Sequence, residues 1–304
     1  MRQALKELVS SAITVEYYLP NGEYKINSSS YSNKKDVCFK GKSDEFIANI
    51  IYNGIVEYAI GEYEIDYENI SEEQLRALAE YTRYDEEDSH TTKLRYGFYG
   101  EVILYAILYS KFKADVLISK GYFYDPLENG EAKGYDAYHL IQNDNSVELW
   151  FGEAKFRNGI KSSIEEVISK LDKAISENYF KKNIIAISKK KFNISNGQIT
   201  IDRLKPITES WREKVSIVIE DELKNNNITL VYPILIAYQQ KKLSDYNDGI
   251  KECIDYIKTL FESGKYKFVN SLNAKIFFMF LPVDNVKQIK ESVLEWISTK
   301  KPLI

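Results

Sequence analysis

The sequence predicts an α/β protein built on a mixed β-sheet with helices on both faces. From Leu94 onward the patterns follow in the order helix, three strands, helix, strand, helix, strand, helix, as in proteins whose helices cover a sheet. The segment Asn227–Gln239 is apolar almost throughout, as strands buried on both faces are. Apolar residues make up 44% and charged residues 28% of the 304 residues, which is typical of a folded globular chain.

The N-terminal part predicts a hairpin followed by two helices. Two short strands are expected within Thr14–Ile26, on either side of the turn sequence Pro20-Asn21-Gly22. The segment SDEFIANIIYNGIVEYAI has helical periodicity, and its first residue, Ser43, suits an N-cap. A second helix is expected from Ser71, because Gln74 three residues later completes a capping-box pattern.

A polar, charged run at Tyr84–Lys93 ends this part of the chain. We interpret the run as a solvated loop and place a domain boundary near its end. The expected organisation is an N-terminal α+β region of residues 1–92, a candidate for docking a partner, and a domain of residues 93–304 that holds the mixed sheet.

The larger domain is expected to open with an apolar helix from Leu94 to Phe112, with Gly97 and Gly100 on one side. The segment ADVLISKGYFYD predicts a strand, and two apolar stretches around the turn Asn143–Ser146 predict a hairpin. The later elements are a helix over 159–180, with Ile160, Ile164, Ile168 and Leu171 on one face, a strand over 227–239, a helix over 246–264, a strand over 274–283 and a helix over 285–298.

Charge and cysteine content restrict the classes of function. The formal net charge is -4, so no overall basic surface indicates nucleic-acid binding, although a local basic patch is compatible with this sum. Cys38 and Cys253 stand far apart without a CxxC pair, which indicates neither a zinc site nor a disulfide framework. The N-terminus lacks a signal-peptide pattern and no stretch of about 20 apolar residues occurs, so we expect a cytoplasmic protein that does not enter a membrane.

Charged residues interrupt the two apolar stretches of the predicted hairpin, GYDAYHLIQNDNSVELWFGEAKF. Asp136 lies near the outer end of the first stretch, and Glu153 and Lys155 lie near the end of the second. If the hairpin turns on Asp144-Asn145, a common type of two-residue loop, Asp136 lies opposite Glu153. Directly opposed residues have Cβ atoms about 4.5–5.5 Å apart, and Lys155 shares the face of Glu153 because side chains alternate along a strand. The three charged groups are therefore expected to converge.

Two carboxylates at this separation repel each other unless a cation lies between them. A ligand set of oxygen atoms alone suits Mg²⁺ or Mn²⁺ and not zinc. Glu101, an unexpected charge on the apolar helix, is a candidate fourth member, because buried acids need a partner or a metal. Spacing alone leaves two alternatives open: an ion-pair ladder on the surface of the hairpin, and an exposed helix face for Glu101.

The residues singled out here resemble the motif of PD-(D/E)xK nucleases, which consists of a helix glutamate, a strand aspartate, and Glu-x-Lys at the end of the next strand. Glu101, Asp136, Glu153 and Lys155 match its positions in order, and Gly134-Tyr135 stands where the motif has its proline. More specifically, the stretches RYGFYGEVILYAIL, KGYDAYHL and ELWFGEAKF are similar to the HamA family, the nuclease subunits of Hachiman antiphage systems.

The resemblance covers roughly Leu94–Leu171 closely and the whole chain more loosely. It implies a restriction-endonuclease-like mixed sheet flanked by helices, cleavage of double-stranded or single-stranded DNA, and a helicase partner, HamB. Arg157 and Lys161 follow the hairpin and are candidates for contacts to the DNA backbone, with ordinary solvated charges as the alternative.

The resemblance also assigns chemical roles. Asp136 and Glu153, with the main-chain carbonyl of Ala154, would hold Mg²⁺ or Mn²⁺, which polarises the phosphate and lowers the pKa of the attacking water. Lys155 would stabilise the charge that develops on the phosphate or orient the water. Glu101 would support this metal or a second one.

Two other functions remain compatible with these observations. One is a non-catalytic subunit that uses a nuclease-like fold to bind or regulate its partner. The other is a nuclease of repair or restriction that is unrelated to Hachiman. The intact set of two acids and a lysine favours catalysis over the first alternative.

Overall fold

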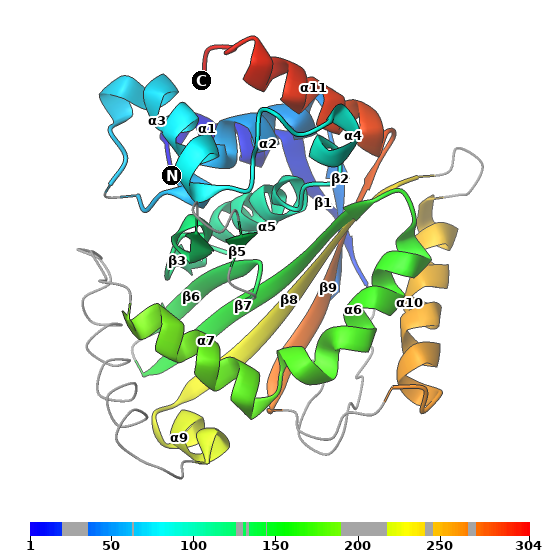
Figure 1. The fold of residues 1–304 in the computed structure, drawn as a ribbon. Helices are drawn as coiled ribbons and strands as arrows, with labels where there is room; N and C mark the ends of the chain where they lie inside the picture. Colours follow the sequence, from blue (N-terminus) through cyan, green and yellow to red (C-terminus); the bar gives the residue numbers. More distant parts are fainter. Residues whose placement is uncertain are drawn as a thin grey trace.

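The chain folds around one seven-stranded mixed β-sheet (Figure 1). The structure, a computed structural model, describes residues 1–19, 36–62, 64–125, 130–131, 134–143, 145–189, 218–240, 246–266 and 272–304. The sheet, together with the helices on both of its faces, confirms the predicted α/β class. The order of its strands is β1 (Ile13–Tyr18), β2 (Val37–Gly41), β9 (Ala274–Val283), β8 (Ile228–Gln239), β7 (Ser146–Arg157), β6 (Ala137–Asn143) and β3 (Asp115–Val116), and a separate ribbon pairs β4 (Tyr124–Asp125) with β5 (Gly130–Glu131).

Helices cover both faces of the sheet and enclose two hydrophobic cores (Figure 1). Side chains alternate between these cores along β8: Val231 and Leu235 enter the first core, and Leu230 and Ile234 enter the second. A strand that is buried on both faces therefore carries the apolar run that the sequence predicts there. The first core lies under α1 (Gln3–Ala12), α2 (Asp44–Ala59), α5 (Phe98–Lys111) and α11 (Val286–Ser298), and the second under α6 (Ile160–Ala174), α7 (Glu177–Lys189), α9 (Ile219–Asn225) and α10 (Tyr246–Glu262).

The N-terminal part of the chain contributes two strands to the same sheet. β1 pairs antiparallel with β2, and β2 pairs parallel with β9, with Val37 opposite Met279. β1 confirms the first strand of the predicted N-terminal hairpin, while the turn sequence Pro20-Asn21-Gly22 lies outside the described residues. The division into residues 1–92 and 93–304 stays a prediction, and the two parts share one sheet.

Side-chain caps fix the starts of two predicted helices. The hydroxyl oxygen of Ser43 accepts a hydrogen bond from the main-chain N–H of Phe46, 3.4 Å away, at the start of α2. The side-chain oxygen of Asn285 accepts one from the N–H of Gln288, 3.0 Å away, at the start of α11. Both caps satisfy N–H groups that have no partner inside the helix.

The start of the helix predicted from Ser71 is wrong, because the helix already includes this residue. The Asp66 carboxylate accepts hydrogen bonds from the main-chain N–H of Glu68, at 3.0 Å, and from the Asn69 side chain, at 2.8 Å. These bonds stabilise a 3₁₀ turn that leads directly into the helix. The elements here are η1 (Tyr67–Asn69), α3 (Ile70–Arg76) and the π-helical turn η2 (Ala77–Tyr81).

The strand predicted over residues 114–125 is mostly wrong, because only Asp115–Val116 join the edge of the main sheet. Gly121 explains the departure: a Cβ at this position would lie 2.3 Å from the carbonyl oxygen of Ala59 and 2.6 Å from the Cβ of Tyr81. The segment leaves the sheet and packs against the end of α2, at a distance that only glycine permits. It forms a 3₁₀ turn, η3 (Lys120–Phe123).

The helix predicted over residues 159–180 is interrupted after Ala174, so α6 and α7 are separate helices. The carbonyl oxygen of Ala174 accepts a hydrogen bond from the Tyr135 hydroxyl, and that of Ile175 accepts one from the Leu272 N–H at 2.6 Å. Hydrogen bonds to distant parts of the chain thus replace those of a continuing helix.

Two further boundaries differ from the prediction. The helix predicted from Leu94 begins at Phe98, because the residues before it form a hydrogen-bonded turn. The polar run Tyr84–Lys93, predicted to be a loop, ends in a short helix whose first turn is capped by the Ser89 hydroxyl. This helix is α4 (His90–Lys93).

No helix among the described residues has both the length and the apolar character needed to cross a bilayer. Cys38 and Cys253 are buried, and neither takes part in a disulfide. This agrees with the absence of a paired cysteine motif in the sequence.

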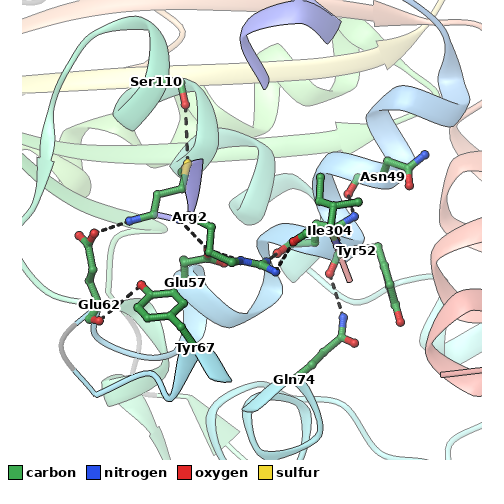
Figure 2. Close-up of polar contacts among 11 residues, drawn as sticks. Arg2, Asn49, Tyr52, Glu57, Glu62, Tyr67, Gln74, Ser110 and Ile304 are labelled. Carbon is green, nitrogen blue, oxygen red and sulfur yellow. Dashed lines mark hydrogen bonds and ion pairs between the residues drawn. The ribbon is translucent and has the colours of Figure 1, made fainter. Parts of the chain in front are cut away.

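Polar contacts join the first residues to the last one (Figure 2). The Met1 ammonium lies 2.6 Å from the Glu62 carboxylate. The guanidinium of Arg2 donates from Nε to Glu57, at 2.8 Å, and from Nη1 to the carbonyl oxygen of Ile304, at 2.9 Å. The side chain of Glu57 is fully buried, so Arg2 and Glu57 form an interior ion pair.

Candidate active site

The β6–β7 hairpin has the register that the sequence predicts. Ala137 lies opposite Gly152, and the main-chain N–H of Asp136 donates to the Gly152 carbonyl oxygen at 2.9 Å. Asp136 therefore lies at the outer end of the hairpin, beside Glu153. Its Oδ2 accepts a hydrogen bond from the main-chain N–H of Ala154 at 2.9 Å, which fixes the carboxylate against β7.

Glu153 and Lys155 lie on the face of β7 that α6 and α7 cover, because Phe151 in the same alternating series belongs to the core on that side. The Lys155 ammonium is ion-paired with Oε1 of Glu153. Both side chains are largely buried, at 10% exposed for Lys155 and 18% for Glu153. The structure thus brings Asp136, Glu153 and Lys155 together.

Burial raises the pKa of Glu153 to about 7, and the negative charge of Asp136 acts in the same direction. Burial alone would lower the pKa of Lys155, but the charges of Glu153 and Asp136 outweigh it and raise this pKa above its ordinary value. Lys155 is therefore charged at neutral pH. It only partly offsets the repulsion between the two carboxylates.

A further acid, Glu166 of α6, belongs to the charge network around Lys155. Glu166 Oε1 lies 3.6 Å from the Lys155 nitrogen and 2.6 Å from the Lys170 nitrogen, and Oε2 pairs with the Arg157 guanidinium. Burial alone would raise the pKa of Glu166, but these three cations lower it to about 2. The sequence prediction missed this residue, although Glu166 and Lys170 stand at i,i+4 spacing in the helix after the Glu-x-Lys strand.

Glu101 is carried by α5, on the opposite face of the sheet from the Glu153–Lys155 pair. The helix approaches β7 closely at Gly100, where a Cβ would lie 3.2 Å from the Cβ of Phe156. Glu101 Oε2 accepts a hydrogen bond from the Tyr58 hydroxyl. Within the described part of the chain, no three His, Cys, Asp or Glu side chains are close enough to hold a metal ion together. The predicted fourth acid is thus not part of a three-carboxylate cluster in this structure.

Two groups that the sequence prediction missed border the site, the buried Lys120 and the half-buried Tyr179. Lys120 of η3 is 6% exposed, and its ammonium donates to the carbonyl oxygen of Tyr135, at 2.5 Å, directly before Asp136. Burial raises the pKa of Tyr179 in α7, the charges of Glu153 and Asp136 raise it further, and the charge of Lys120 lowers it. A single lysine within the apolar stretch ADVLISKGYF was the available signal.

The two residues predicted to contact DNA are exposed and already paired. The side chains of Arg157 and Lys161 are each 53% exposed. Arg157 pairs with Glu166, and the Lys161 nitrogen lies 2.5 Å from Oε1 of Glu252. Contacts from these two residues to DNA stay a prediction, and they require the present pairs to rearrange.

The donor set at the end of the hairpin fits a divalent cation such as Mg²⁺ or Mn²⁺. The side chains of Asp136 and Glu153 and the carbonyl of Ala154 would offer oxygen ligands only, which these ions prefer. Burial and the Asp136 charge raise the pKa of Glu153, so negative charge is incompletely compensated there. A cation beside the two carboxylates would compensate this negative charge.

One family of known proteins matches this chain. A sequence model of the HamA family matches residues 10–297, nearly the whole chain. The matched range includes the N-terminal strands β1 and β2 as well as the hairpin that carries the charged cluster. No curated protein and no solved structure gives a significant match.

Proposed function

The chain belongs to the HamA family, a subunit family of the Hachiman antiphage defence system, and from this premise we propose that it is a metal-dependent DNA endonuclease. The observation that carries the proposal is the cluster of Asp136, Glu153 and Lys155 at the end of the hairpin, in which Glu153 and Lys155 are largely buried. A largely buried carboxylate beside a second one costs stability, and groups with strongly shifted pKa values, such as Glu153, concentrate at functional sites.

The hairpin residues have separate roles in this proposal. Asp136 and Glu153 hold Mg²⁺ or Mn²⁺ together with the carbonyl oxygen of Ala154, and the Ala154 N–H orients the Asp136 carboxylate. The bound cation supplies Lewis-acid polarisation of the scissile phosphate. Lys155 stabilises the negative charge that develops on the phosphate oxygens. Glu166, 3.6 Å from the Lys155 nitrogen, restrains the position of the ammonium.

Glu101 supports the site from the α5 side. It lines the same pocket as Lys120, whose ammonium is bonded to the carbonyl directly before Asp136. Glu101 therefore acts as a positioning residue. Its replacement by glutamine should reduce cleavage less than the same replacement of Glu153.

We further propose that a helicase partner, HamB, controls the nuclease. A net charge of -4 limits contacts to phosphates, so the isolated chain should bind DNA weakly and with strong dependence on salt. A cytoplasmic nuclease of low sequence specificity would also damage the DNA of its own cell unless it is restrained. HamB supplies both DNA engagement and restraint in this scheme, and its action on damaged or phage DNA positions the nuclease.

A cleavage assay on linear, circular and single-stranded DNA with Mg²⁺ or Mn²⁺ tests the nuclease proposal. Wild type should cleave and Lys155→Ala should not. Lys224→Ala, which removes the lysine of another Glu-x-Lys pair in α9, is the matched control and should retain activity. Co-purification with HamB, and plasmid degradation with and without ATP, test the control by the helicase.

One observation favours a second function, that of a non-catalytic docking subunit. Lys155 already pairs with Glu153 and Glu166, so its charge is compensated by acids of the same chain and does not require a metal ion or a phosphate. Calorimetric titration with Mg²⁺ separates the two functions: a catalytic site binds the ion and loses binding in Glu153→Gln, whereas a structural network binds the ion in neither protein. The HamA match sets aside a repair or restriction nuclease unrelated to Hachiman.

A further inference from the structure

A pocket of about 400 Å³ lies beside Glu101, on the α5 side of the sheet. Its walls come from the end of α2, the turn after η2, the turn before α5, and the segment from η3 to β4. Sites for small molecules have volumes of about 300–1,000 Å³, so this pocket is large enough for a ligand. None of the three charged hairpin residues lines it.

Cationic groups outnumber acidic ones in the pocket wall. Arg83 and Arg95 line it with exposed side chains, and neither guanidinium has an ion pair or hydrogen bond within the described part of the chain. Lys120 lines it from the buried side. One carboxylate, Glu101, lies in the wall, where the Tyr58 hydroxyl donates to it. The pocket therefore favours an anionic ligand.

The acidic run before α4 lies beside the pocket but contributes no carboxylate to its wall. The hydroxyl of Tyr96 donates to the Asp88 carboxylate at 2.5 Å and accepts from the main-chain N–H of Asp85 at 3.2 Å. Tyr96 lines the pocket, and neither aspartate does.

Tyrosine rings form much of the remaining wall. Tyr81 and Tyr124 are half-buried, so part of each ring is accessible, while Tyr58 and Tyr96 lie deeper. Aromatic walls beside unpaired guanidinium groups are the chemistry that recognises nucleotides, because a base stacks on the ring and a phosphate pairs with arginine.

We propose that this pocket binds a nucleotide of single-stranded DNA, with its phosphate at Arg83 and Arg95 and its base against Tyr81 or Tyr124. A base within a duplex would first have to unpair and rotate out of its stack, a free-energy cost that a single strand does not have. Lys120 connects the pocket to the hairpin through its bond to the carbonyl before Asp136. The inference rests on the proposed nuclease function for the choice of DNA as the ligand.

Equilibrium binding of the chain to a fluorescein-labelled oligothymidylate in EDTA, where a metal-dependent nuclease cannot cleave, tests the proposal. The pocket variant is Arg83→Ala/Arg95→Ala. The matched control, Lys224→Ala/Lys251→Ala, removes two exposed positive charges from α9 and α10. Losing the neutralisation of one phosphate of a single strand reduces the magnitude of the slope of log K against log salt concentration by about 0.7. Because Arg83 and Arg95 hold the same phosphate in this proposal, the pocket variant should show a slope smaller in magnitude than that of the control by about 0.7.

A second variant tests the stacking of the base. Tyr81→Leu should weaken binding about tenfold at fixed salt, since stacking on an aromatic ring contributes strongly to single-strand binding. A blunt duplex of the same length should bind the wild type and the pocket variant with equal affinity. Melting temperatures of all variants establish that each is folded.

Three results would overturn the proposal: a pocket variant that behaves like the control, a wild type that does not bind single strands, or an equal loss of affinity for the duplex. Failure of the nuclease proposal would give a different set of results in the binding and cleavage assays. A wild type that binds single strands through the pocket but never cleaves with Mg²⁺ or Mn²⁺ would remove the nuclease and retain the binding site.

Discussion

The Asp136 carboxylate accepts a hydrogen bond from the main-chain N–H of Ala154, 2.9 Å away, across the two strands that carry the candidate active site. This bond fixes one carboxylate to the backbone residue that directly follows the other, Glu153. The two acids cannot separate unless the hairpin opens, so their repulsion is part of the folded state. This relationship motivates the first two predictions.

Glu153→Gln should abolish DNA cleavage and leave the melting temperature of the metal-free protein unchanged or higher. Glutamine keeps the volume of the side chain and can accept a hydrogen bond from Lys155, but it removes a charge that burial and Asp136 disfavour. Cleavage with Mg²⁺ and melting in EDTA measure the two effects. Glu222→Gln in α9 should change neither, and a steep fall in melting temperature for Glu153→Gln would indicate a structural ion pair.

Mg²⁺ or Mn²⁺ should restore cleavage to protein treated with EDTA and raise its melting temperature, because a ligand that binds only the folded state stabilises it. Ca²⁺ should bind without supporting comparable turnover, since its bonds to oxygen are longer and its geometry is looser. Glu153→Gln should lose the shift in melting temperature caused by Mg²⁺. Cleavage that persists undiminished in excess EDTA would contradict this mechanism.

His139 should make the protein sensitive to acid. Burial lowers its pKa to about 4, and its Nδ1 lies 2.9 Å from the carbonyl oxygen of Ala114, to which the neutral ring donates. Because the folded-state pKa lies below the ordinary value, this stability is fully present above about pH 6.5 and is lost as the pH falls toward 4. Between pH 8 and pH 4.5, wild type should lose about 2–3 kcal/mol more unfolding free energy than His139→Gln. Equal losses in urea unfolding at the two pH values would refute the assignment.

Arg2→Ala should destabilise the fold by about 3–5 kcal/mol, because it leaves the fully buried Glu57 carboxylate without its cation. Adding Glu57→Gln should recover part of the loss. Lys258→Ala is the matched control: its partner Glu262 lies 3.9 Å away, and both side chains are exposed, so the change should cost less than about 0.5 kcal/mol. Urea unfolding measures all three variants, and a loss for Arg2→Ala no larger than that of the control would rule out the interior ion pair.

Gly100→Ala should lower stability by about 1–3 kcal/mol, the usual effect of overfilling a packed contact. Alanine favours a helix over glycine by about 1 kcal/mol, but the new methyl group would lie 3.2 Å from the Cβ of Phe156 and push α5 away from β7. Urea unfolding gives the sign of the balance. A net gain in stability would mean that α5 and β7 separate at no cost.

The elements that the sequence predicts well are those with local causes. A two-residue turn, predicted from the sequence, sets which residues of the two strands face each other, and the register of β6 and β7 confirms the expected position of Asp136 beside Glu153. Apolar runs marked β8 and β9, even though β8 contains a proline in the middle of the sheet. The structure explains this exception, since Gly152 faces Pro233 and a Cβ on that glycine would lie 3.0 Å from the proline ring.

The features that could not be predicted depend on contacts between distant segments. Gly121 meets Ala59 of α2, and this contact draws a predicted strand out of the sheet. Lys120 lies near Asp136 because its ammonium donates to the main-chain carbonyl of Tyr135. Every residue has such a carbonyl, so the sequence does not indicate which one a lysine will contact. Glu166 reaches Lys155 only because α6 folds back over β7. Spacing along the chain contains none of this information.

The last strand of the chain, β9, lies in the middle of the sheet, between β2 and β8. The two halves of the sheet therefore cannot join until β9 has left the ribosome, and the pairing of Val37 with Met279 is among the slow, long-range steps of folding. A nascent or prematurely terminated chain without β9 exposes an edge of β8, and the pair formed by β1 and β2 has no strand through which to join the rest of the sheet. Fragments of the proposed nuclease that end before β9 thus lack the complete sheet around its two carboxylates, and the danger it poses to the cell that makes it begins only once β9 has been added.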